Sequence, residues 1–70
     1  MLLKGKIDFY ECEHNGDLDN YIEDMISCGA KIISRELDYD GEVGSVEFEV
    51  DDMKEFMSKF EETDSYDFVN

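Results

Sequence analysis

The sequence holds few of the residues that most often take part in chemistry: one histidine and two cysteines. Cys12 and His14 stand two positions apart, so they point to the same side if the chain is extended there. A Cys/His nucleophile needs a hydrogen bond between the thiol and the imidazole, and a third group that orients the base. Strand neighbours two positions apart rarely meet in this way, so we expect no nucleophilic catalysis from this pair.

The same residues raise the question of a metal site. A zinc ion takes about four ligands and prefers nitrogen and sulfur. Cys12, His14 and Cys28 supply three, so a zinc site would need a carboxylate or a second chain, and it stays an alternative. Two cysteines are too few for a disulfide framework, which predicts free thiols in a reducing compartment. We expect neither a metal nor a cofactor.

Other catalytic motifs do not occur in the sequence. Residues 38–42 resemble a calcium loop in composition, but their spacing fails the EF-hand pattern and predicts a hairpin loop instead. The sequence has no glycine loop that cradles phosphate and no nucleophile elbow. Acid–base catalysis needs two carboxyl groups in different environments, and a crowd of exposed acids does not indicate that. We therefore expect that the protein is not an enzyme.

Acidic residues dominate the 70-residue chain, with 20 acids against six bases and a formal net charge of −14. Residues 8–24 hold seven acids and no base, and residues 36–55 hold nine acids and one base. Direct nucleic-acid binding needs a basic patch, and anionic membranes attract bases, so both partners are disfavoured. The field attracts basic partners instead, including proteins with a groove for DNA or RNA. A solubilising surface is the alternative explanation.

Alternation and periodicity predict the elements that must position these acids. Residues 3–13 alternate in period two and predict a strand, with Leu3, Ile7 and Phe9 on its inner face. Asp17 is the expected N-cap of a helix, and Gly29 the expected left-handed residue after its end. The helix has one apolar stripe, formed by Leu18, Tyr21, Ile22, Met25 and Ile26.

The second half of the chain predicts a hairpin and a second helix. Residues 30–39 predict a strand that turns Ile33, Arg35, Leu37 and Tyr39 to the core side, with Arg35 near an edge. After a loop over residues 40–44, residues 45–50 predict a strand that buries Val46, Phe48 and Val50. Asp52 is the expected N-cap of a helix whose stripe is Met53, Phe56, Met57 and Phe60, and residues 66–69 predict a short final strand.

This order predicts a single α+β domain over residues 1–70, a ferredoxin-like βαββα(β) sandwich with both helices on one face of the sheet. We expect the first and third strands to lie parallel at the centre, with the second and fourth at the edges. No apolar run is long enough for a membrane span and the first residues do not form a secretory signal, which favours a soluble, cytoplasmic protein.

The open face of this sheet is the candidate binding surface. Outward residues of the three main strands converge there: Asp8, Tyr10, Glu36, Asp38, Glu47 and Glu49. Alternate carboxylates on a strand lie about 6.5–7 Å apart, a scale similar to the phosphate repeat of DNA. Like charges that face one another across strands cost stability, so a function outside folding would explain them. Tyr10 is the expected anchor, because tyrosine combines contact area with a polar tip.

In size and charge the chain resembles small acidic inhibitor proteins encoded by phages, including anti-CRISPR proteins and other DNA mimics. The resemblance covers the whole chain and rests on no motif. It implies a stoichiometric inhibitor that occupies a basic nucleic-acid groove, in the host cytosol if a phage encodes it. Two alternatives stay open: a regulatory or ligand-binding ferredoxin-like module that forms a homodimer through its sheet, and a metal-dependent enzyme fragment.

Overall fold

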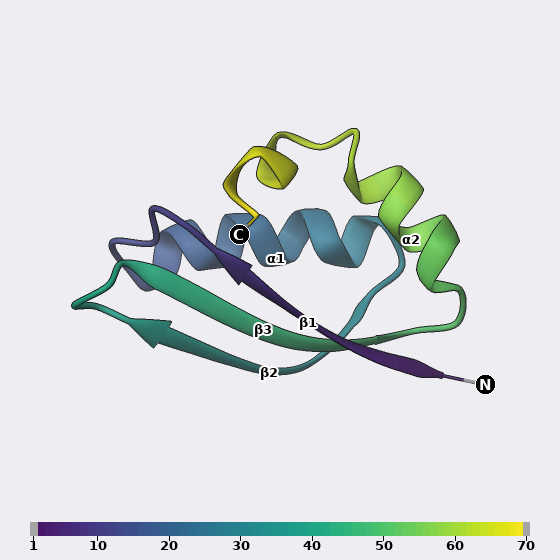
Figure 1. Cartoon of the computed structure of the whole chain (residues 1–70), viewed down its shortest axis with the longest axis horizontal. Coiled ribbons are helices and arrows are strands. Elements are labelled where there is room, and N and C mark those ends of the chain that lie inside the picture. The colour runs from purple at the N-terminus through teal and green to yellow at the C-terminus, as the bar shows by residue number, and fades with distance from the viewer. Residues whose placement is uncertain (1, 70) are drawn as a thin grey trace.

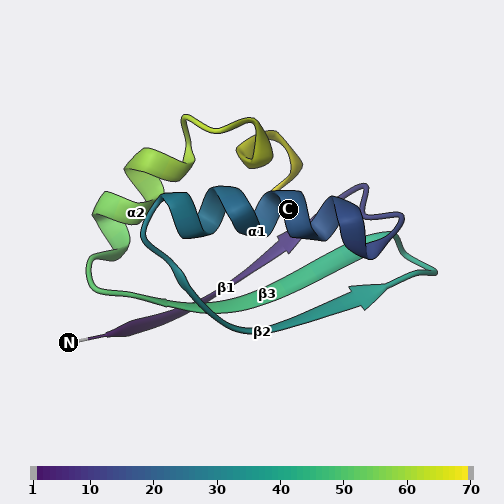
Figure 2. The ribbon, with the colours of Figure 1, turned by 180° about the vertical axis from the view of Figure 1, so that it is seen from behind.

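The computed structural model describes residues 2–69, which form one antiparallel sheet with two helices on one of its faces (Figure 1). The elements follow in the order β-α-β-β-α, as the sequence predicts. Their bounds are β1 Leu3–Phe9, α1 Asn15–Ser27, β2 Lys31–Asp38, β3 Val43–Val50, α2 Met53–Phe60 and a 3-10 helix η1 at Asp64–Phe68. The view from behind shows α1 running along the sheet, with α2 near one end of α1 and η1 above α1 on the same side of the sheet (Figure 2).

The strand order is β1-β3-β2, and both pairs are antiparallel. The expectation that the first and third strands lie parallel at the centre is therefore wrong. A right-handed crossover through α1 makes β1 parallel to β2, and the hairpin reverses β3, so β1 and β3 must run in opposite directions. Within the described residues β3 is the central strand and β1 and β2 are the edges.

The predicted fourth strand is a 3-10 helix that touches the sheet at one point. Phe9 and Val69 form an isolated antiparallel bridge, and the Tyr10 N–H donates to the Phe68 carbonyl at 2.7 Å. Side chains of this segment contact the two helices, as Phe68 stacks on Tyr21 and Tyr66 meets Phe60 edge to face. The buried Ser65 hydroxyl donates to Asp24 of α1.

Aromatic side chains form much of the core between the sheet and the helices. Phe9 stacks on Tyr21 with a centroid distance of 4.8 Å, and Tyr21 stacks on Phe68 at 5.3 Å. On the α2 side Phe56 packs against Phe48 at 5.0 Å and stacks on Phe60 at 5.3 Å. Phe9 also meets Phe60 edge to face at 6.1 Å, so one connected set of rings joins β1, α1, η1, β3 and α2.

Helix α1 begins earlier than the sequence indicates. His14 is the N-cap residue and makes no side-chain cap hydrogen bond, so the prediction that Asp17 is the N-cap is wrong. Asp17 lies in the first turn, where its carboxylate accepts from the Glu13 N–H at 3.1 Å. At the other end Gly29 has φ +103°, and the Ala30 N–H donates to the Met25 carbonyl, which confirms the predicted glycine cap.

Strand β2 contains a bulge that the alternation does not predict. Ile32 pairs with Phe48 and Ser34 pairs with Glu47, so Ile33 has no partner residue of its own. Ile33 is 43% exposed, which makes its predicted place in the core wrong. Tyr39, predicted on the same inner face, lies just after the strand and is 61% exposed. Arg35 opposes the buried Val46 on the edge strand β2, as expected, and its guanidinium binds Asp19 and the Asn15 carbonyl of α1, which the sequence did not predict.

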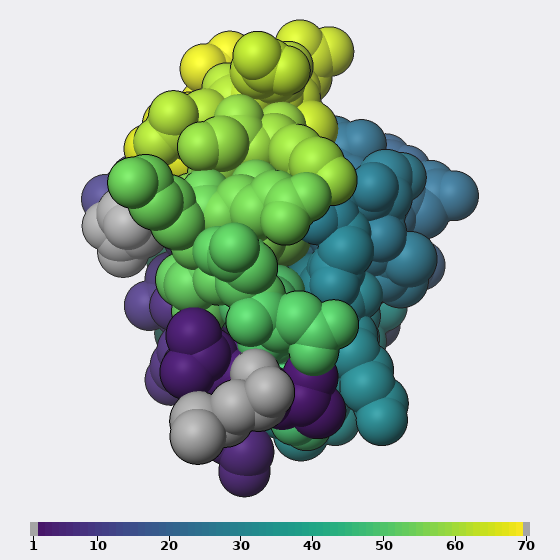
Figure 3. Space-filling model, turned by 90° about the vertical axis from the view of Figure 1, so that its right-hand side faces the viewer, coloured from purple at the N-terminus to yellow at the C-terminus, as the bar shows by residue number. Residues whose placement is uncertain are grey.

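Helix α2 packs close to the beginning of β1, as the side view shows (Figure 3). Its N-cap is Asp52, whose carboxylate accepts from the Glu55 N–H at 3.1 Å, as predicted. Gly5 of β1 makes the close approach possible, because a Cβ there would lie 2.7 Å from Cζ of Phe48 and 3.0 Å from Cε of Met53. Phe56 and Phe60 of the predicted stripe are buried.

Candidate binding surface

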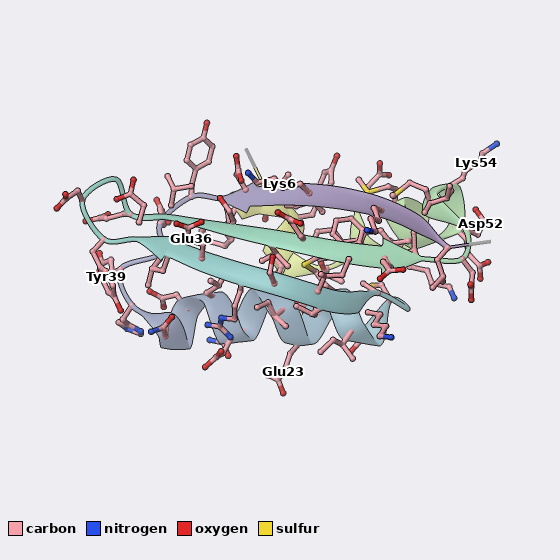
Figure 4. All side chains as sticks on the ribbon, turned by 90° about the horizontal axis from the view of Figure 1, so that it is seen from below. Lys6, Glu23, Glu36, Tyr39, Asp52 and Lys54 are labelled. Atoms are coloured by element: carbon pink, nitrogen blue, oxygen red, sulfur yellow. The ribbon has the colours of Figure 1, made fainter. Side chains whose placement is uncertain are left out.

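The face of the sheet opposite the helices presents most of the predicted surface residues (Figure 4). Asp8 and Glu49 are partly buried, whereas Glu36, Asp38 and Glu47 are exposed. In the view from below, Glu36 and Tyr39 lie toward one end of the sheet, and Asp52 and Lys54 lie at the other. The register of the strands decides which charges face one another across this surface.

Lysines stand opposite the two glutamates of β3. Glu49 lies between Lys4 of β1 and Lys31 of β2, and Glu47 lies between Lys6 and Ser34. The antiparallel register places these bases there, whereas the expected parallel arrangement brought Asp8 beside the glutamates. We call Glu47, Glu49 and the three lysines the mixed end, because opposite charges face one another across its strands.

Carboxylates without such bases gather at the opposite end of the sheet. Ser45 of β3 lies between Asp8 of β1 and Glu36 of β2, and the next pair toward the hairpin is Val43 with Asp38. We call Asp8, Glu36 and Asp38 the acidic end. The structure therefore divides the predicted surface into two charge environments.

Two members of the acidic end are held in place by hydrogen bonds. The Ser45 hydroxyl donates to Oδ1 of Asp8 at 2.7 Å. Oδ1 of Asp38 accepts from the Asp40 and Gly41 N–H groups at 3.1 and 3.2 Å, which fixes the start of the hairpin turn. Each carboxylate therefore has a defined position and still presents its charge at the surface.

Glu11 and Glu42 belong to the same region, and the sequence analysis missed them. Both are exposed residues with positive φ, +55° for Glu11 and +54° for Glu42. The Cys12 N–H donates to the Glu42 carbonyl at 2.8 Å, so the loop after β1 lies against the β2–β3 hairpin. This contact joins segments 30 residues apart, and no local pattern in the sequence indicates it.

The ion pairs among residues 2–69 do not include any carboxylate of the predicted binding surface. His14 lies 3.7 Å from Asp17, Lys59 lies 3.0 Å from Glu55, and Arg35 pairs with Asp19. No carboxylate of the acidic end takes part in an ion pair within the described chain. The acidic end therefore keeps its charge available to a partner.

Tyr10 follows β1 at the edge of the acidic end. Its side chain is 49% exposed, and its backbone N–H donates to Phe68 of the C-terminal segment. The bridge between Phe9 and Val69 holds the neighbouring backbone. The predicted anchor residue is thus accessible and has a defined main-chain position.

The thiols and the histidine do not assemble a metal site. Residues 2–69 contain no group of three or more His, Cys, Asp or Glu side chains placed to hold a metal ion. Cys12 and Cys28 are free and buried, and burial raises the pKa of both thiols. A raised thiol pKa lowers the thiolate population at neutral pH and therefore the reactivity of both cysteines.

A small cavity of about 180 Å³ lies between the end of α1 and the start of α2. Its lining includes Cys28, Asp51, Glu55 and Lys59. Glu55 is already paired with Lys59 there. The cavity is separate from the acidic end, because its β3 residue is Val50 whereas the acidic end is built around Ser45.

Comparison with protein-family models, with curated proteins and with solved structures finds no match to this chain. Among the described residues, no helix has both the length and the apolar character that a membrane crossing requires. The geometry and charge of the sheet surface are therefore the features of the molecule that bear on its function.

Proposed function

We propose that this chain is an acidic inhibitor that binds a basic, nucleic-acid-binding surface of a partner protein, as anti-CRISPR proteins and other DNA mimics do. The acidic end supports this proposal most directly. Its carboxylates are held at the surface by a rigid sheet and by turn hydrogen bonds, with no lysine opposite them in the register. In the proposed setting the protein works in the cytoplasm of the host cell.

The proposal includes a finer assignment of the fold. The order β1-β3-β2 corresponds to three adjacent strands of a ferredoxin-like sheet, and the bridge at Val69 lies on the side of β1 where a fourth strand would pair. In this assignment η1 takes the place of the fourth strand. The helices cover the other face of the sheet, which leaves the acidic surface open to a partner (Figure 1).

The experiment compares two variants that remove charge from the two ends of the sheet. Asp8→Asn, Glu36→Gln and Asp38→Asn together neutralise the acidic end and keep acceptor oxygens for the existing hydrogen bonds. Glu47→Gln with Glu49→Gln is the control at the mixed end, and it removes two negative charges where the acidic-end variant removes three. Each protein is immobilised and used to capture proteins from a bacterial lysate, with washes at low and high salt and with added duplex DNA.

We expect the unmodified chain to capture nucleic-acid-binding proteins that salt and DNA release, because screening and competition both act on a charged interface. The acidic-end variant should lose this capture, and the mixed-end variant should retain most of it. Capture that resists both salt and DNA, or equal losses in the two variants, contradicts the proposal.

A further inference from the structure

The two edges of the sheet differ in what covers them. On the outer side of β1, the Tyr10 N–H donates to Phe68 and Phe9 forms a bridge with Val69, so the end of this edge is closed. Among the described residues no strand or bridge pairs with the outer side of β2 (Figure 4). The β2 edge therefore has no strand partner among the described residues, and α1 runs along its helix side (Figure 4).

The bond from Tyr10 fixes the direction of the backbone groups across the whole sheet. Neighbouring residues of an antiparallel strand direct their N–H and C=O groups to opposite sides. The backbone N–H of Tyr10 is directed away from β3, so the backbone N–H and C=O groups of Phe9 and Ile7 are directed toward β3. The backbone groups of their partners Gly44 and Val46 are directed toward β1. The backbone N–H and C=O groups of the intervening residues of β3, such as Ser45 and Glu47, are then directed toward β2.

The same alternation identifies the outward groups of β2. The backbone groups of Ser45 in β3 are directed toward its partner Glu36, and those of Glu36 are directed back toward β3. The flanking residues Arg35 and Leu37 therefore direct their N–H and C=O groups outward. No backbone hydrogen bond from another described segment reaches them. Four unpaired main-chain groups therefore line this edge on the C-terminal side of the bulge at Ile33.

The side chains around this edge are acidic and partly apolar. Glu36 and Asp38 flank it on the open face, and Glu23 projects from α1 beyond it on the helix side (Figure 4). Tyr39 is exposed at its end. The basic group of Arg35 is already bound by Asp19 and by the Asn15 carbonyl. The β1 edge differs, because its outward residues include Lys4 and Lys6.

We infer that the outer edge of β2 over Arg35–Leu37 binds an extended basic segment of the partner as an added strand. This inference rests on the proposed function and names the part of the partner that is recognised. Main-chain hydrogen bonds to Arg35 and Leu37 would hold the segment, and alternate lysine or arginine side chains would lie over Glu36 and Asp38. A second copy of this chain fits the edge poorly, because it would bring a net charge of −14 against the same acids.

The experiment uses amide hydrogen exchange in the isotope-labelled full chain. The probe is a synthetic eight-residue peptide of alternating arginine and valine, and the control peptide replaces arginine with glutamate. We expect the saturating basic peptide to slow exchange at Arg35 and Leu37 by about tenfold or more, as new hydrogen bonds protect their N–H groups. Lys4 and Lys6 are the internal control, because they present outward amides on the other edge.

A backbone modification tests the hydrogen bond itself. Chemical synthesis of the chain with N-methyl-leucine at Leu37 removes one outward donor and leaves the β2–β3 ladder intact. Affinity for the basic peptide should fall by about tenfold, in line with the loss of one well-made hydrogen bond. N-methyl-lysine at Lys6 is the matched control and should leave the affinity unchanged.

The outcomes separate this inference from the proposed function. A basic peptide that binds in a salt-sensitive way but leaves Arg35 and Leu37 exchanging freely, or that protects Lys4 and Lys6, overturns docking at β2. Absence of peptide binding overturns it also. Protection at β2 together with a failed lysate capture supports the edge and contradicts inhibition of a nucleic-acid-binding protein.

Discussion

Ile22 and Ile26 of α1 are one helical turn apart and belong to the same predicted stripe, yet only Ile22 is buried. Ile26 is 56% exposed although its neighbour Met25 is completely buried, so the buried face of α1 is narrower than the predicted stripe. Periodicity gives the direction of a face but not its width. The last residue of a stripe is therefore the position where a prediction of burial most easily fails.

The two isoleucines provide a matched pair for measuring burial. Ile22→Ala should lower the free energy of unfolding by about 2–4 kcal/mol, through lost burial and the cavity that remains. Ile26→Ala should change it by less than about 0.5 kcal/mol, as exposed positions usually do. Urea denaturation of the two variants checks this, and equal losses would show that the packing of α1 differs from the structure.

The buried thiols predict a loss of stability at alkaline pH. An unfolded cysteine loses its proton near pH 8.5, whereas burial raises the pKa of Cys12 and Cys28 in the folded chain. The unfolded state therefore binds fewer protons above about pH 8.5, and the free energy of unfolding should fall as the pH rises further. The contribution is fully present below that pH.

The measurement is a set of urea midpoints between pH 7 and 10. The double variant Cys12→Ala and Cys28→Ala should lose less stability over this range, each protein being compared with its own value at pH 7. Tyr21 keeps a residual dependence in both proteins, because burial raises the pKa of its hydroxyl as well. An identical pH dependence in the two proteins would contradict the role of the thiols.

At the scale of elements, local patterns predicted what depends on local chemistry. The order β-α-β-β-α, the glycine cap at Gly29 and the N-cap at Asp52 follow from periodicity and hydrogen-bonding side chains within a few residues. The bulge at Ile33 and the turn of η1 depend on partners elsewhere in the chain, such as Phe48 and Asp24. No local pattern contains that information.

The candidate surface shows the same division. Alternation correctly placed Glu47 and Glu49 opposite the buried side of β3, since Val46 and Phe48 fill the core. It did not reveal which residues of β1 stand across from them, because that depends on the strand direction. The antiparallel register brings Lys4 and Lys6 there, and the division into two ends follows from it.

The N-cap of α2 can be tested by itself. Asp52→Ala removes the acceptor of the Glu55 N–H and should lower the free energy of unfolding by about 1 kcal/mol. Asp51→Ala removes the same charge one residue earlier, where no cap hydrogen bond is formed, and serves as the control. Thermal melts of both variants check this, and a larger loss for Asp51 would contradict the assignment of the cap.

For the whole molecule, the charge of −14 acts on folding and on binding in opposite ways. Only three ion pairs form among residues 2–69, so most of the 20 acids have no ion-pair partner there and the net charge of the folded chain repels itself. The same field should accelerate the approach of a basic partner. Both effects are screened by salt, over about 8 Å at physiological ionic strength.

Raising the salt concentration from about 20 mM to about 500 mM spans Debye lengths well above and below the spacing of these carboxylates. The Tm should therefore rise with salt, since screening relieves repulsion within the folded chain. Affinity for the basic peptide should fall over the same range, since screening weakens attraction between the molecules.

Neutralising the acidic end with Asp8→Asn, Glu36→Gln and Asp38→Asn should reduce the salt dependence of both the Tm and the peptide affinity, because these acids have no base opposite them. The mixed-end variant Glu47→Gln with Glu49→Gln should leave the salt dependence of the peptide affinity nearly unchanged. Relative to the unmodified chain, its Tm should rise less than the Tm of the acidic-end variant. If the two variants change both salt dependences only in proportion to the three and two charges that they remove, the net charge alone controls the protein and the division of the sheet has no functional role.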